Sequence, residues 1–510
     1  MAGEPDSLII GAGSAGATLA ARLSEDPGHA VALIEAGPPY APSRADELSN
    51  LAFALTERDW GFGARTHGER IVPYPLGKAA GGGSAVNGGL AIRGMPDDYD
   101  EWERLGAAGW AWKDLLPAFR RLESDPLGEE HLHGRDGPLP IERWSPDAYI
   151  PLQQQFLAAC RAHGIAETAD HNAPTSTGVG PFPMNRRGNL RVSTAIGLLA
   201  PALDRSNLEV HSDARVTRLL LDGRRARGAL VERAGETFEV TAKRVVVCAG
   251  AINGPALLMR SGIGPRAALA KHGIACAIDL PGVGAHLMEH PGALLAFVPK
   301  QGVCDPERQP QYQLGLRFTA PGSDIPNDML IGVMNHIDLR GMPDLHAAAG
   351  ADIGIALTCG VHHPLSRGNV TLTSADPDDP PQIDLRLLDH PEDTRRLLAG
   401  LRLAHTLSQT APLDGSLARL AAPAAAVFDD DRALEGYARS VLTPWFHATG
   451  TCRMGSPDDP AAVVDPGCAV RGAEALYVVD GSILPQIPRA PTNLTIIAVA
   501  ERAAELLRAS

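Results

Sequence analysis

A glycine-rich turn that follows an apolar run near the start of the chain constrains its fold most strongly. Residues 8–16 read Leu-Ile-Ile-Gly-Ala-Gly-Ser-Ala-Gly, and Glu35 ends the next apolar run. Gly11 suits a tight turn, Gly13 lets the backbone approach a pyrophosphate, and Gly16 allows a helix to pack closely on a strand. The pyrophosphate would meet free N–H groups at the positive end of that helix. The pattern therefore predicts a dinucleotide site in which Glu35 accepts hydrogen bonds from a ribose.

Short β-branched runs with the pattern of buried parallel strands recur in the middle and at the end of the chain. The expected strands cover residues 8–10, 30–35, 243–248 and 475–479, and the expected helices cover residues 14–24, 255–259 and 496–508. We expect these pieces to assemble into one discontinuous, Rossmann-like α/β domain. Two further runs, 208–210 and 216–221, are expected in a separate small sheet.

The stretches between these segments have different patterns. Residues 369–372 alternate apolar and polar side chains, and residues 393–409 have the spacing of an amphipathic helix. We predict a second, α+β domain with an antiparallel sheet, which would form the far wall of a substrate cleft. The predicted dinucleotide-binding domain comprises residues 1–144, 191–295 and 431–510, and the second domain comprises residues 145–190 and 296–430.

Charge and composition argue against several classes of partner. The net charge of −14 disfavours nucleic acid and anionic membranes. No apolar run reaches the roughly 18 residues of a membrane span, and the first residues resemble no secretory signal. Seven scattered cysteines without a C-x-x-C pair indicate buried free thiols, in place of disulfides or a thiolate zinc site. We expect a cytoplasmic protein.

The second informative stretch is a glycine-rich loop over residues 77–87. It reads Gly-Lys-Ala-Ala-Gly-Gly-Gly-Ser-Ala-Val-Asn, and its three successive glycines fit neither a helix nor an ordinary strand. Their bare backbone N–H groups suit an anion or a flat ring. A flexible linker is the alternative when this loop is considered alone.

Further motifs follow in the second half of the chain. Residues 250–265 contain Gly-Ala, a proline, Leu-Leu and Ser-Gly-Ile-Gly-Pro, and residues 447–455 read His-Ala-Thr-Gly-Thr-Cys-Arg-Met-Gly. Val-Val-Asp-Gly-Ser at 478–482 and Thr-Asn-Leu at 492–494 complete the series. With these motifs in this order, the chain resembles the glucose–methanol–choline (GMC) oxidoreductase family, whose members carry FAD. The resemblance covers nearly the whole chain.

The resemblance implies which residues hold the cofactor. The glycine turn and Glu35 would bind the ADP half of FAD, the loop at 81–87 would lie along the flavin and pyrophosphate, and Val216 would approach the adenine through its backbone. The expected FAD-binding set is Gly11, Gly13, Ser14, Ala15, Gly16, Glu35, Ala36, Lys78, Gly81, Gly82, Ser84, Asn87, Gly88, Val216, Ala249, Gly250, Asp480, Gly481, Asn493, Leu494 and Thr495. Val86 occupies the position of a histidine that binds FAD covalently in some relatives, so we expect non-covalent FAD. Ala285 is a second departure, because the family usually has asparagine there.

The same resemblance makes His447 the expected catalytic base and Asn493 its partner. Hydride leaves an alcohol carbon readily only as the hydroxyl loses its proton, so a base that titrates near neutrality is required. In the family the matching histidine faces the flavin N5 and removes that proton while hydride passes to N5. Asparagine does not titrate, so Asn493 can only orient the hydroxyl or alkoxide through its amide. A hydrogen-bonded core histidine is the alternative for His447.

Two other histidine pairs have alternative interpretations. Residues 286–290, His-Leu-Met-Glu-His, match a zinc-protease pattern. The run ends at Pro291 and leaves room for barely two helical turns, and the resemblance places it in a loop near the flavin and the substrate channel. His362 and His363 are expected in a loop near the cleft, with a substrate contact as the alternative. We expect no metal site.

The sequence therefore predicts an FAD-dependent oxidase that converts a small primary alcohol, aromatic or furanic, to an aldehyde and passes electrons to O2. The narrower likeness is to bacterial hydroxymethylfurfural, aryl-alcohol and pyridoxine oxidases. The alternatives are a dehydrogenase with a quinone or mycofactocin-type electron carrier, and a lyase or photodecarboxylase on the same scaffold. Trp445 and Phe446, next to the catalytic histidine, either stack on a flat substrate or pack against the flavin-domain core.

Overall fold

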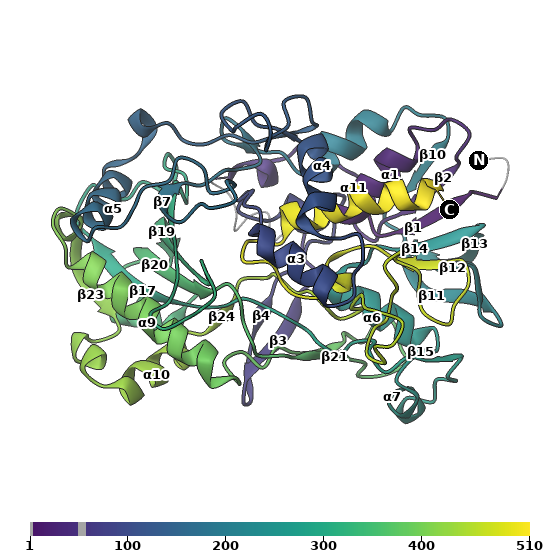
Figure 1. The fold of residues 1–510 in the computed structure, drawn as a ribbon. Helices are drawn as coiled ribbons and strands as arrows, with labels where there is room; N and C mark the ends of the chain where they lie inside the picture. Colours follow the sequence, from purple (N-terminus) through teal and green to yellow (C-terminus); the bar gives the residue numbers. More distant parts are fainter. Residues whose placement is uncertain (1–3, 49–57, 510) are drawn as a thin grey trace.

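The computed structural model describes residues 4–48 and 58–509, and two large sheets dominate it. Figure 1 shows the parallel sheet with β1, β2 and β14 toward one end of the molecule and the antiparallel sheet with β17, β19 and β20 toward the other. Each sheet has its own cluster of buried apolar side chains. The mixed α/β architecture predicted from the sequence is confirmed.

The parallel sheet is assembled from segments that lie far apart in the sequence. Its strand order is β10-β2-β1-β14-β25, and every neighbouring pair is parallel. Ile10 at the end of β1 is level with Ile34 of β2 and Val247 of β14, so the three strands end together. The strands are β1 (Ser7–Ile10), β2 (Val31–Ile34), β10 (Leu208–His211), β14 (Arg244–Val247) and β25 (Leu476–Val478).

Three helices follow or cover these strands as the sequence predicts. Helix α1 (Ser14–Leu23) begins after the glycine turn, α6 (Gly250–Arg260) begins after β14, and α11 (Asn493–Ala509) closes the chain. Helix α11 packs on α1 and on α4 (Trp112–Leu122), and it runs across the parallel sheet in Figure 1. The apolar residues of α1 and α11 are almost all buried, which matches their high alanine content.

One predicted strand belongs to a different sheet from the one expected. The run at 208–210 was expected in a small sheet with 216–221, but β10 pairs in parallel with β2 at the edge of the large sheet. Its Leu208 is buried, which an exposed hairpin strand would not achieve. The small sheet instead consists of β11 (Arg215–Asp222), β12 (Arg225–Arg233) and β13 (Glu236–Thr241).

The antiparallel sheet has the order β23-β17-β20-β19-β18-β7, with the short β24 also paired to β17. Helices α5 (Pro151–Ala162), α9 (Pro391–Ser408) and α10 (Asp431–Ser440) pack with this sheet. Its strands are β7 (Gly178–Pro181), β17 (Pro291–Pro299), β18 (Leu314–Phe318), β19 (Met329–Asp338), β20 (Ile353–Val361), β23 (Leu417–Ala422) and β24 (Thr443–Pro444).

The strands and helices bear on the predicted domain limits. The expected limit after residue 295 falls inside β17, and the limit before residue 431 separates α10 from α9, on which it packs. We therefore propose that the second domain extends from Pro291 and includes α10.

The remaining elements are α3 (Pro96–Arg104), α7 (Arg266–Lys271), α8 (Pro343–Ala349), β3 (Phe62–His67), β4 (Arg70–Tyr74), β5 (Glu123–Ser124), β6 (Leu139–Pro140), β8 (Arg186–Arg187), β9 (Leu190–Arg191), β15 (Ile263–Gly264), β16 (Ile278–Asp279), β21 (Asn369–Thr371) and β22 (Gln382–Asp384).

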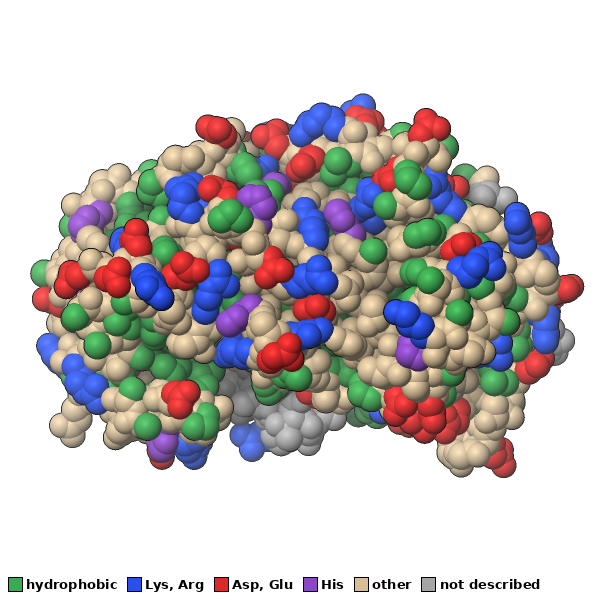
Figure 2. Space-filling model, turned by 90° about the horizontal axis from the view of Figure 1, so that it is seen from below, with side chains coloured by type: hydrophobic (Ala, Val, Ile, Leu, Met, Phe, Trp, Pro, Cys, Tyr) green, Lys and Arg blue, Asp and Glu red, His purple; other side chains and the backbone are tan. Residues whose placement is uncertain are grey.

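The surface carries charges of both signs. In Figure 2 acidic and basic side chains are interspersed over most of the face, and a cluster of acidic side chains lies near its lower edge. Many of these charges form exposed pairs such as Arg161–Glu167, which contribute little to stability. Among the helices of residues 4–48 and 58–509, none combines the length and the apolar character needed to cross a bilayer.

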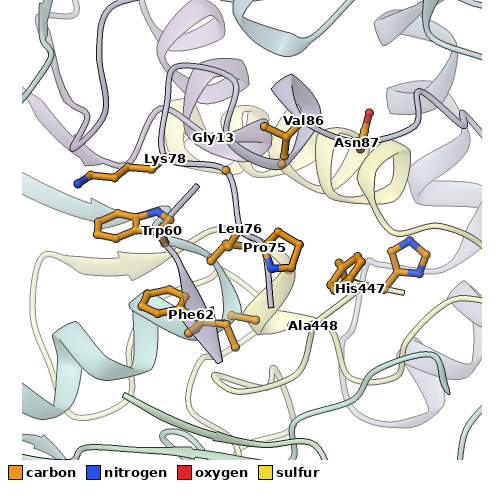
Figure 3. Close-up of a pocket in the computed structure, with 18 of the residues that line it drawn as sticks. Gly13, Trp60, Phe62, Pro75, Leu76, Lys78, Val86, Asn87, His447 and Ala448 are labelled. Atoms are coloured by element: carbon orange, nitrogen blue, oxygen red, sulfur yellow. The ribbon is translucent and has the colours of Figure 1, made fainter. Parts of the chain in front are cut away.

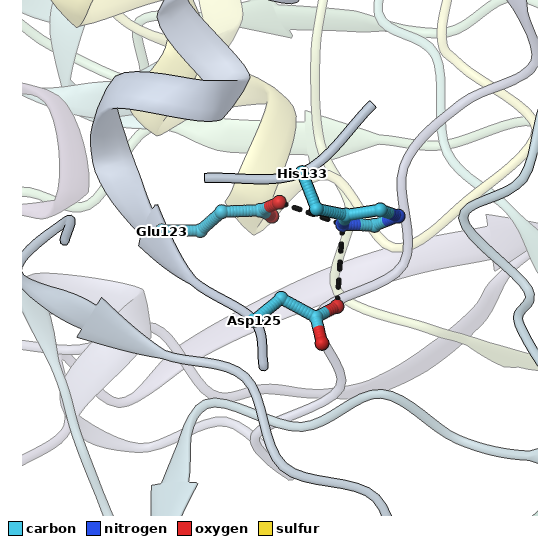
Figure 4. Close-up of side chains that lie close together, drawn as sticks. All are labelled: Glu123, Asp125 and His133. Carbon is cyan, nitrogen blue, oxygen red and sulfur yellow. Dashed lines mark hydrogen bonds and ion pairs between the residues drawn. The ribbon is translucent and has the colours of Figure 1, made fainter. Parts of the chain in front are cut away.

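A buried ionic cluster lies where the chain leaves α4 (Figure 4). His133 places Nδ1 2.7 Å from a Glu123 oxygen and 3.2 Å from an Asp125 oxygen, and Nε2 3.0 Å from an Asp170 oxygen. Burial opposes a charge on His133, but its hydrogen bonds to Asp170 and Glu123 outweigh that cost and raise its pKa. Two arginines complete the cluster: Arg93 and Arg143.

The charges of this cluster balance when His133 is protonated, because three cations then face three carboxylates. A divalent metal at Glu123, Asp125 and His133 would displace the histidine proton and leave the arginines in excess. We therefore interpret the cluster as a structural ion-pair network that ties the segment after α4 to residues 133–170.

We expect His133→Gln to lower the free energy of unfolding by about 3–5 kcal/mol, because it leaves buried carboxylates without their cation. A raised pKa means that the stabilisation by His133 is complete below about pH 6.5 and is lost as the pH rises through the folded-state pKa. Urea unfolding at a series of pH values should show this loss in the wild type and its absence in His133→Gln. The exposed neighbour His131→Gln is the control, and equal stability of both variants would contradict the prediction.

Candidate active site

A cavity of about 970 Å³ lies between the parallel and antiparallel sheets and receives side chains from both. Figure 3 shows Gly13, Val86 and Asn87 along one wall, Lys78 and Trp60 at one end, and His447 at the other. The structure thus brings together most of the residues predicted from the sequence. Those that line the cavity are Gly11, Gly13, Ser14, Ala15, Glu35, Ala36, Lys78, Gly82, Asn87, Gly88, Val216, Ala249, Gly250, His447, Asp480, Gly481 and Asn493.

Five predicted cofactor residues lie behind the cavity wall. A Cβ on Gly16 would be 1.8 Å from the Gly11 carbonyl oxygen, so this glycine serves the close packing of α1 on β1. Ser84 donates to the Gly81 carbonyl at 2.6 Å, and Thr495 exchanges a hydrogen bond with a buried tyrosine. Leu494 is fully buried in the apolar core. These residues shape the wall and do not face the cavity.

The two glycine-rich segments cross at Gly13 and Gly82. Gly82 has a φ of +50°, and a Cβ there would be 2.7 Å from the Cα of Gly13. Gly81 donates its N–H to the Ala12 carbonyl at 2.7 Å, which fixes the second loop on the first. The loop at 81–87, which contains a short 3₁₀ turn over Gly82–Ala85, is therefore an ordered part of the cavity wall and not a flexible linker.

Two buried carboxylates order the ends of the parallel strands. Glu35 accepts the N–H groups of Ala12 and Gly37, each at 2.8 Å, and Asp480 accepts those of Gly250 and Ser482, each at 2.7 Å. Burial outweighs these hydrogen bonds and raises the pKa of both carboxyl groups. Both side chains also line the cavity, so each fixes the backbone at a strand end and borders the ligand space.

His447 follows β24 and is held by the two residues that precede β17, Glu289 and His290. Its backbone N–H donates to both carboxylate oxygens of Glu289, at 2.8 and 2.9 Å. Its Nδ1 lies 2.9 Å from Nδ1 of His290, while Nε2 forms no hydrogen bond with any described residue. Burial in this largely apolar pocket lowers the pKa of His447 to about 3. The ring is therefore neutral at physiological pH and can accept a proton, but the expected titration near neutrality is not found, because burial disfavours the charged imidazolium.

Three residues beside His447 are expected near the cleft from the sequence, but none of them is predicted to have a catalytic role. Glu289 is buried and also accepts the Tyr74 hydroxyl, and burial raises its pKa to about 7. His290 stacks on His362 with ring centroids 4.4 Å apart, and both rings are buried. The 286–290 run contains no helix, so the metalloprotease geometry is absent from this segment. The position of residue 290 before Pro291 gives no hint of residue 447, because the two are brought together by tertiary contacts that include the pairing of β17 with β24 and the hydrogen bonds of Glu289.

Asn493 lines the same cavity but is oriented from the cofactor side. Its side-chain carbonyl accepts the Ser14 hydroxyl at 2.7 Å, so helix α1 fixes the amide plane. The carbonyl is thereby occupied, and the amide N–H₂ is the group left for a ligand in the cavity.

Aromatic side chains on the antiparallel sheet occupy notches left by glycines. The Trp445 indole lies over Gly292 and Gly360, which are directly paired, and a Cβ on either would clash with it. Phe182 lies in the same way over Gly315. Tyr312 contacts Phe182 edge-on, and its hydroxyl has no hydrogen-bond partner among the described residues. These rings and the apolar side chains of β17 and β19 form the substrate-side wall of the cavity.

The residues present fit FAD. A Cβ added to Gly83 or Gly250 would meet no atom within 4 Å, so bare backbone borders open space at the loop 81–87 and at the start of α6. Helix α1 begins beside them, and its first N–H groups lack intrahelical partners and suit a pyrophosphate. The cavity volume of about 970 Å³ is at the upper end for ligand sites, as a large cofactor and a small substrate together require.

A parallel sheet with this glycine turn, and a neutral histidine across the cavity from it, fit a dinucleotide-dependent oxidoreductase. The GMC oxidoreductase family model matches residues 5–292 with its N-terminal part and residues 364–500 with its C-terminal part. The chain belongs to the GMC oxidoreductase family. It is therefore an FAD-dependent oxidoreductase that acts on CH–OH groups, and this prediction from the sequence is confirmed.

Curated relatives cover almost the whole chain. It is 36% identical to the 5-(hydroxymethyl)furfural oxidase of Methylovorus sp. (strain MP688), over 98% of both chains. It is 35% identical to the oxygen-dependent choline dehydrogenase of Brucella ovis, over 98% of this chain and 95% of that protein. Among solved structures, pyridoxine 4-oxidase from Mesorbium loti is 31% identical with a TM-score of 0.93, over 99% of both chains. Formate oxidase, at 24% identity and a TM-score of 0.91, shares the fold.

Proposed function

We propose that the protein oxidises a neutral aromatic or furanic primary alcohol to the aldehyde and passes the electrons to O2. The observation that carries the proposal is the neutral His447, whose free Nε2 borders a cavity with an aromatic and apolar far wall. Two relatives above 30% identity support the choice of O2 and of a flat ring, because their names describe oxidases of hydroxymethylfurfural and of pyridoxine.

When bound, FAD, which we propose is held non-covalently, accepts the hydride of the alcohol carbon. His447 accepts the hydroxyl proton at Nε2, and its low pKa keeps that nitrogen unprotonated until substrate arrives. The Asn493 amide N–H₂ can donate to the reacting oxygen, while Ser14 holds its orientation. The aromatic wall excludes water and holds the ring of the substrate against the cofactor.

The substrate-side wall favours a neutral ring over a cation. Its lining residues from the antiparallel sheet are apolar or uncharged, except Asp338, which is exposed and paired with Arg340. Choline, the substrate named for some of the relatives, carries a quaternary ammonium group. Aromatic faces can hold such a cation, but the one carboxylate among the described residues of this wall, Asp338, is already paired with Arg340, so a neutral ring is the better match. Hydroxymethylfurfural, benzyl alcohol and choline therefore form a suitable test panel.

We expect anaerobic mixing with hydroxymethylfurfural or benzyl alcohol to bleach the flavin, and choline to leave it yellow. Admission of air should then restore the colour quickly with stoichiometric peroxide, as an oxidase requires. Slow recolouring would identify a dehydrogenase with another acceptor, such as a quinone. Failure of every alcohol to bleach the flavin would refute alcohol oxidation and leave the lyase and photodecarboxylase alternatives.

The unpaired Tyr312 hydroxyl is expected to recognise an acceptor on the substrate ring. Tyr312→Phe should lower kcat/KM for hydroxymethylfurfural about fivefold, which corresponds to one lost neutral hydrogen bond of about 1 kcal/mol. Benzyl alcohol has no ring acceptor, so its kcat/KM should not change and serves as the internal control. An equal loss for both alcohols would mean that the phenyl ring packs differently and that the hydroxyl plays no part.

A further inference from the structure

The side of His447 that faces away from the cavity contacts a second histidine. Nδ1 of His447 and Nδ1 of His290 are 2.9 Å apart, and the two rings meet edge to face at 5.1 Å. One of the two nitrogens must therefore carry a proton and the other a lone pair. Which of them donates decides whether Nε2 of His447 presents a lone pair or an N–H to the cavity.

A single carboxylate holds the backbones of both histidines. Glu289 accepts the N–H of His290 at 2.9 Å and that of His447 at 2.8 Å with the same oxygen. The His290 carbonyl in turn accepts the N–H of Trp445 at 3.1 Å. The His290 ring is fixed as well, because it stacks on His362, whose ring contacts the Trp445 indole edge-on at 5.0 Å. The pair is thus rigidly positioned.

The surroundings of His290 select one of the two arrangements. Its Nδ1 is occupied by His447, and its Nε2 is buried without a regular hydrogen bond. The backbone of His362 acts on the His290 ring in the sense that raises its pKa, as a carbonyl oxygen does. A proton on Nε2 of His290 is attracted by that oxygen, whereas a lone pair would be repelled. His290 then has its lone pair on Nδ1 and accepts from His447.

We propose that His290 is a positioning residue that holds His447 in the tautomer with Nδ1 protonated and Nε2 free to accept the substrate proton. The proposal rests on the proposed alcohol oxidation. In the step concerned the O–H bond of the alcohol breaks, its electron pair stays on oxygen and its proton moves to Nε2. The His447 imidazolium that forms keeps its Nδ1–H bond to His290, which shares the new positive charge.

Replacements at position 290 show whether this side chain acts as a hydrogen-bond acceptor for His447 or only fills the volume beside it. The side-chain oxygens of asparagine and aspartate lie at the same distance from the backbone as Nδ1 of histidine. His290→Asn should keep the acceptor and reduce flavin within about threefold of the wild-type rate, whereas His290→Leu should be slower by about 10–100-fold. His346→Asn, which replaces an exposed histidine paired with Asp352, is the control and should reduce flavin at the wild-type rate.

His290→Asp adds a charge to the acceptor and gives the sharpest test. A carboxylate beside Nδ1 favours the imidazolium, so the pKa seen in the pH profile of flavin reduction should rise by about 1 or more. The other titratable groups that face His290 are Glu289 with its partner Tyr74, and His362 and His363. The profile is therefore also recorded with Glu289→Gln, in which a shift that belongs to Glu289 disappears. An unchanged profile in His290→Asp would overturn the proposal, even if His290→Leu does not fold.

A readout without turnover separates this proposal from the proposed function. In holoenzyme labelled with ¹⁵N-histidine, the His447 resonances, assigned by their loss in His447→Ala, should show a protonated Nδ1 and a bare Nε2. His290→Leu should show a mixture of tautomers. If no alcohol bleaches the flavin but the tautomer is as expected, the proposed function fails and the role of His290 stands. A protonated Nε2 in the wild type would overturn the role of His290.

Discussion

Replacing His447 by alanine should slow flavin reduction by the alcohol by a factor of about 10²–10⁴, the range that one general base contributes. The reason is that His447 is the one histidine among the described residues that line the cavity, so no other imidazole can take the proton. FAD should stay bound, because the His447 side chain bonds only to His290 and none of its hydrogen bonds reaches the glycine-rich segments. Stopped-flow mixing without oxygen measures the rate, and the absorbance spectrum measures bound FAD.

The pH profile gives this prediction a second test. A base whose pKa is lowered to about 3 stays competent in mildly acidic solution, so reduction by the wild type should change little between about pH 5 and 7. An added base such as imidazole should partly restore reduction in His447→Ala, since the cavity left by the side chain is accessible from the substrate side. Near-normal reduction without any added base would remove His447 from the role of catalytic base.

Asn493→Ala should have a smaller effect on flavin reduction than His447→Ala. Asparagine cannot take the proton, so its loss should slow reduction by less than about tenfold, the effect of one hydrogen bond. Its bond to Ser14 lies beside the dinucleotide turn, so FAD affinity should fall as well. His447→Ala and Asn493→Ala thus separate proton transfer from the orientation of cofactor and substrate. A larger kinetic defect in Asn493→Ala than in His447→Ala would reverse these roles.

The cofactor side of the site could be predicted from the sequence because the residues that form it lie close together in the chain. Gly11 and Gly13 are required by one turn, and Glu35 follows one strand at a fixed distance, so a short window contains the whole pattern. The loop at 81–87 is also recognisable from a short window, because its three glycines indicate a place where the backbone approaches another backbone segment or a cofactor closely. The pairing of β1 with β14, and of β14 with β25, then follows from the rule that buried parallel strands share one sheet.

The substrate side was not readable, because its residues are joined only by the antiparallel sheet. Gly292 and Gly360 lie far apart in the sequence and together make the notch for Trp445. A single glycine in a strand has many explanations, and nothing in either segment points to an indole. His290 and His362 were each assigned to loops near the cleft, but their stacking depends on β17 and β20 lying side by side. Such contacts require the fold.

Gly82→Ala should lower the free energy of unfolding by about 2–5 kcal/mol and release FAD. The left-handed backbone at φ +50° costs an alanine roughly 1–2 kcal/mol. Its Cβ would also lie 2.7 Å from the Cα of Gly13, and forced displacement of packed atoms costs roughly a further 1–3 kcal/mol. Both glycine-rich segments would move apart, and they form the wall against which we propose the pyrophosphate binds. Denaturant unfolding and FAD retained after gel filtration measure the two effects.

Two other glycines show whether the damage comes from strain or from an occupied cavity. Gly341→Ala lies in an exposed turn with open space around it and should change neither stability nor FAD content. Gly83→Ala also meets no protein atom within 4 Å, so the apoprotein should unfold like the wild type. Its methyl group would nevertheless enter the space assigned to FAD, and the Kd for FAD should rise. Wild-type FAD affinity in Gly83→Ala would mean that the cofactor does not contact this loop. The contact between Gly13 and Gly82 would then contribute to stability alone.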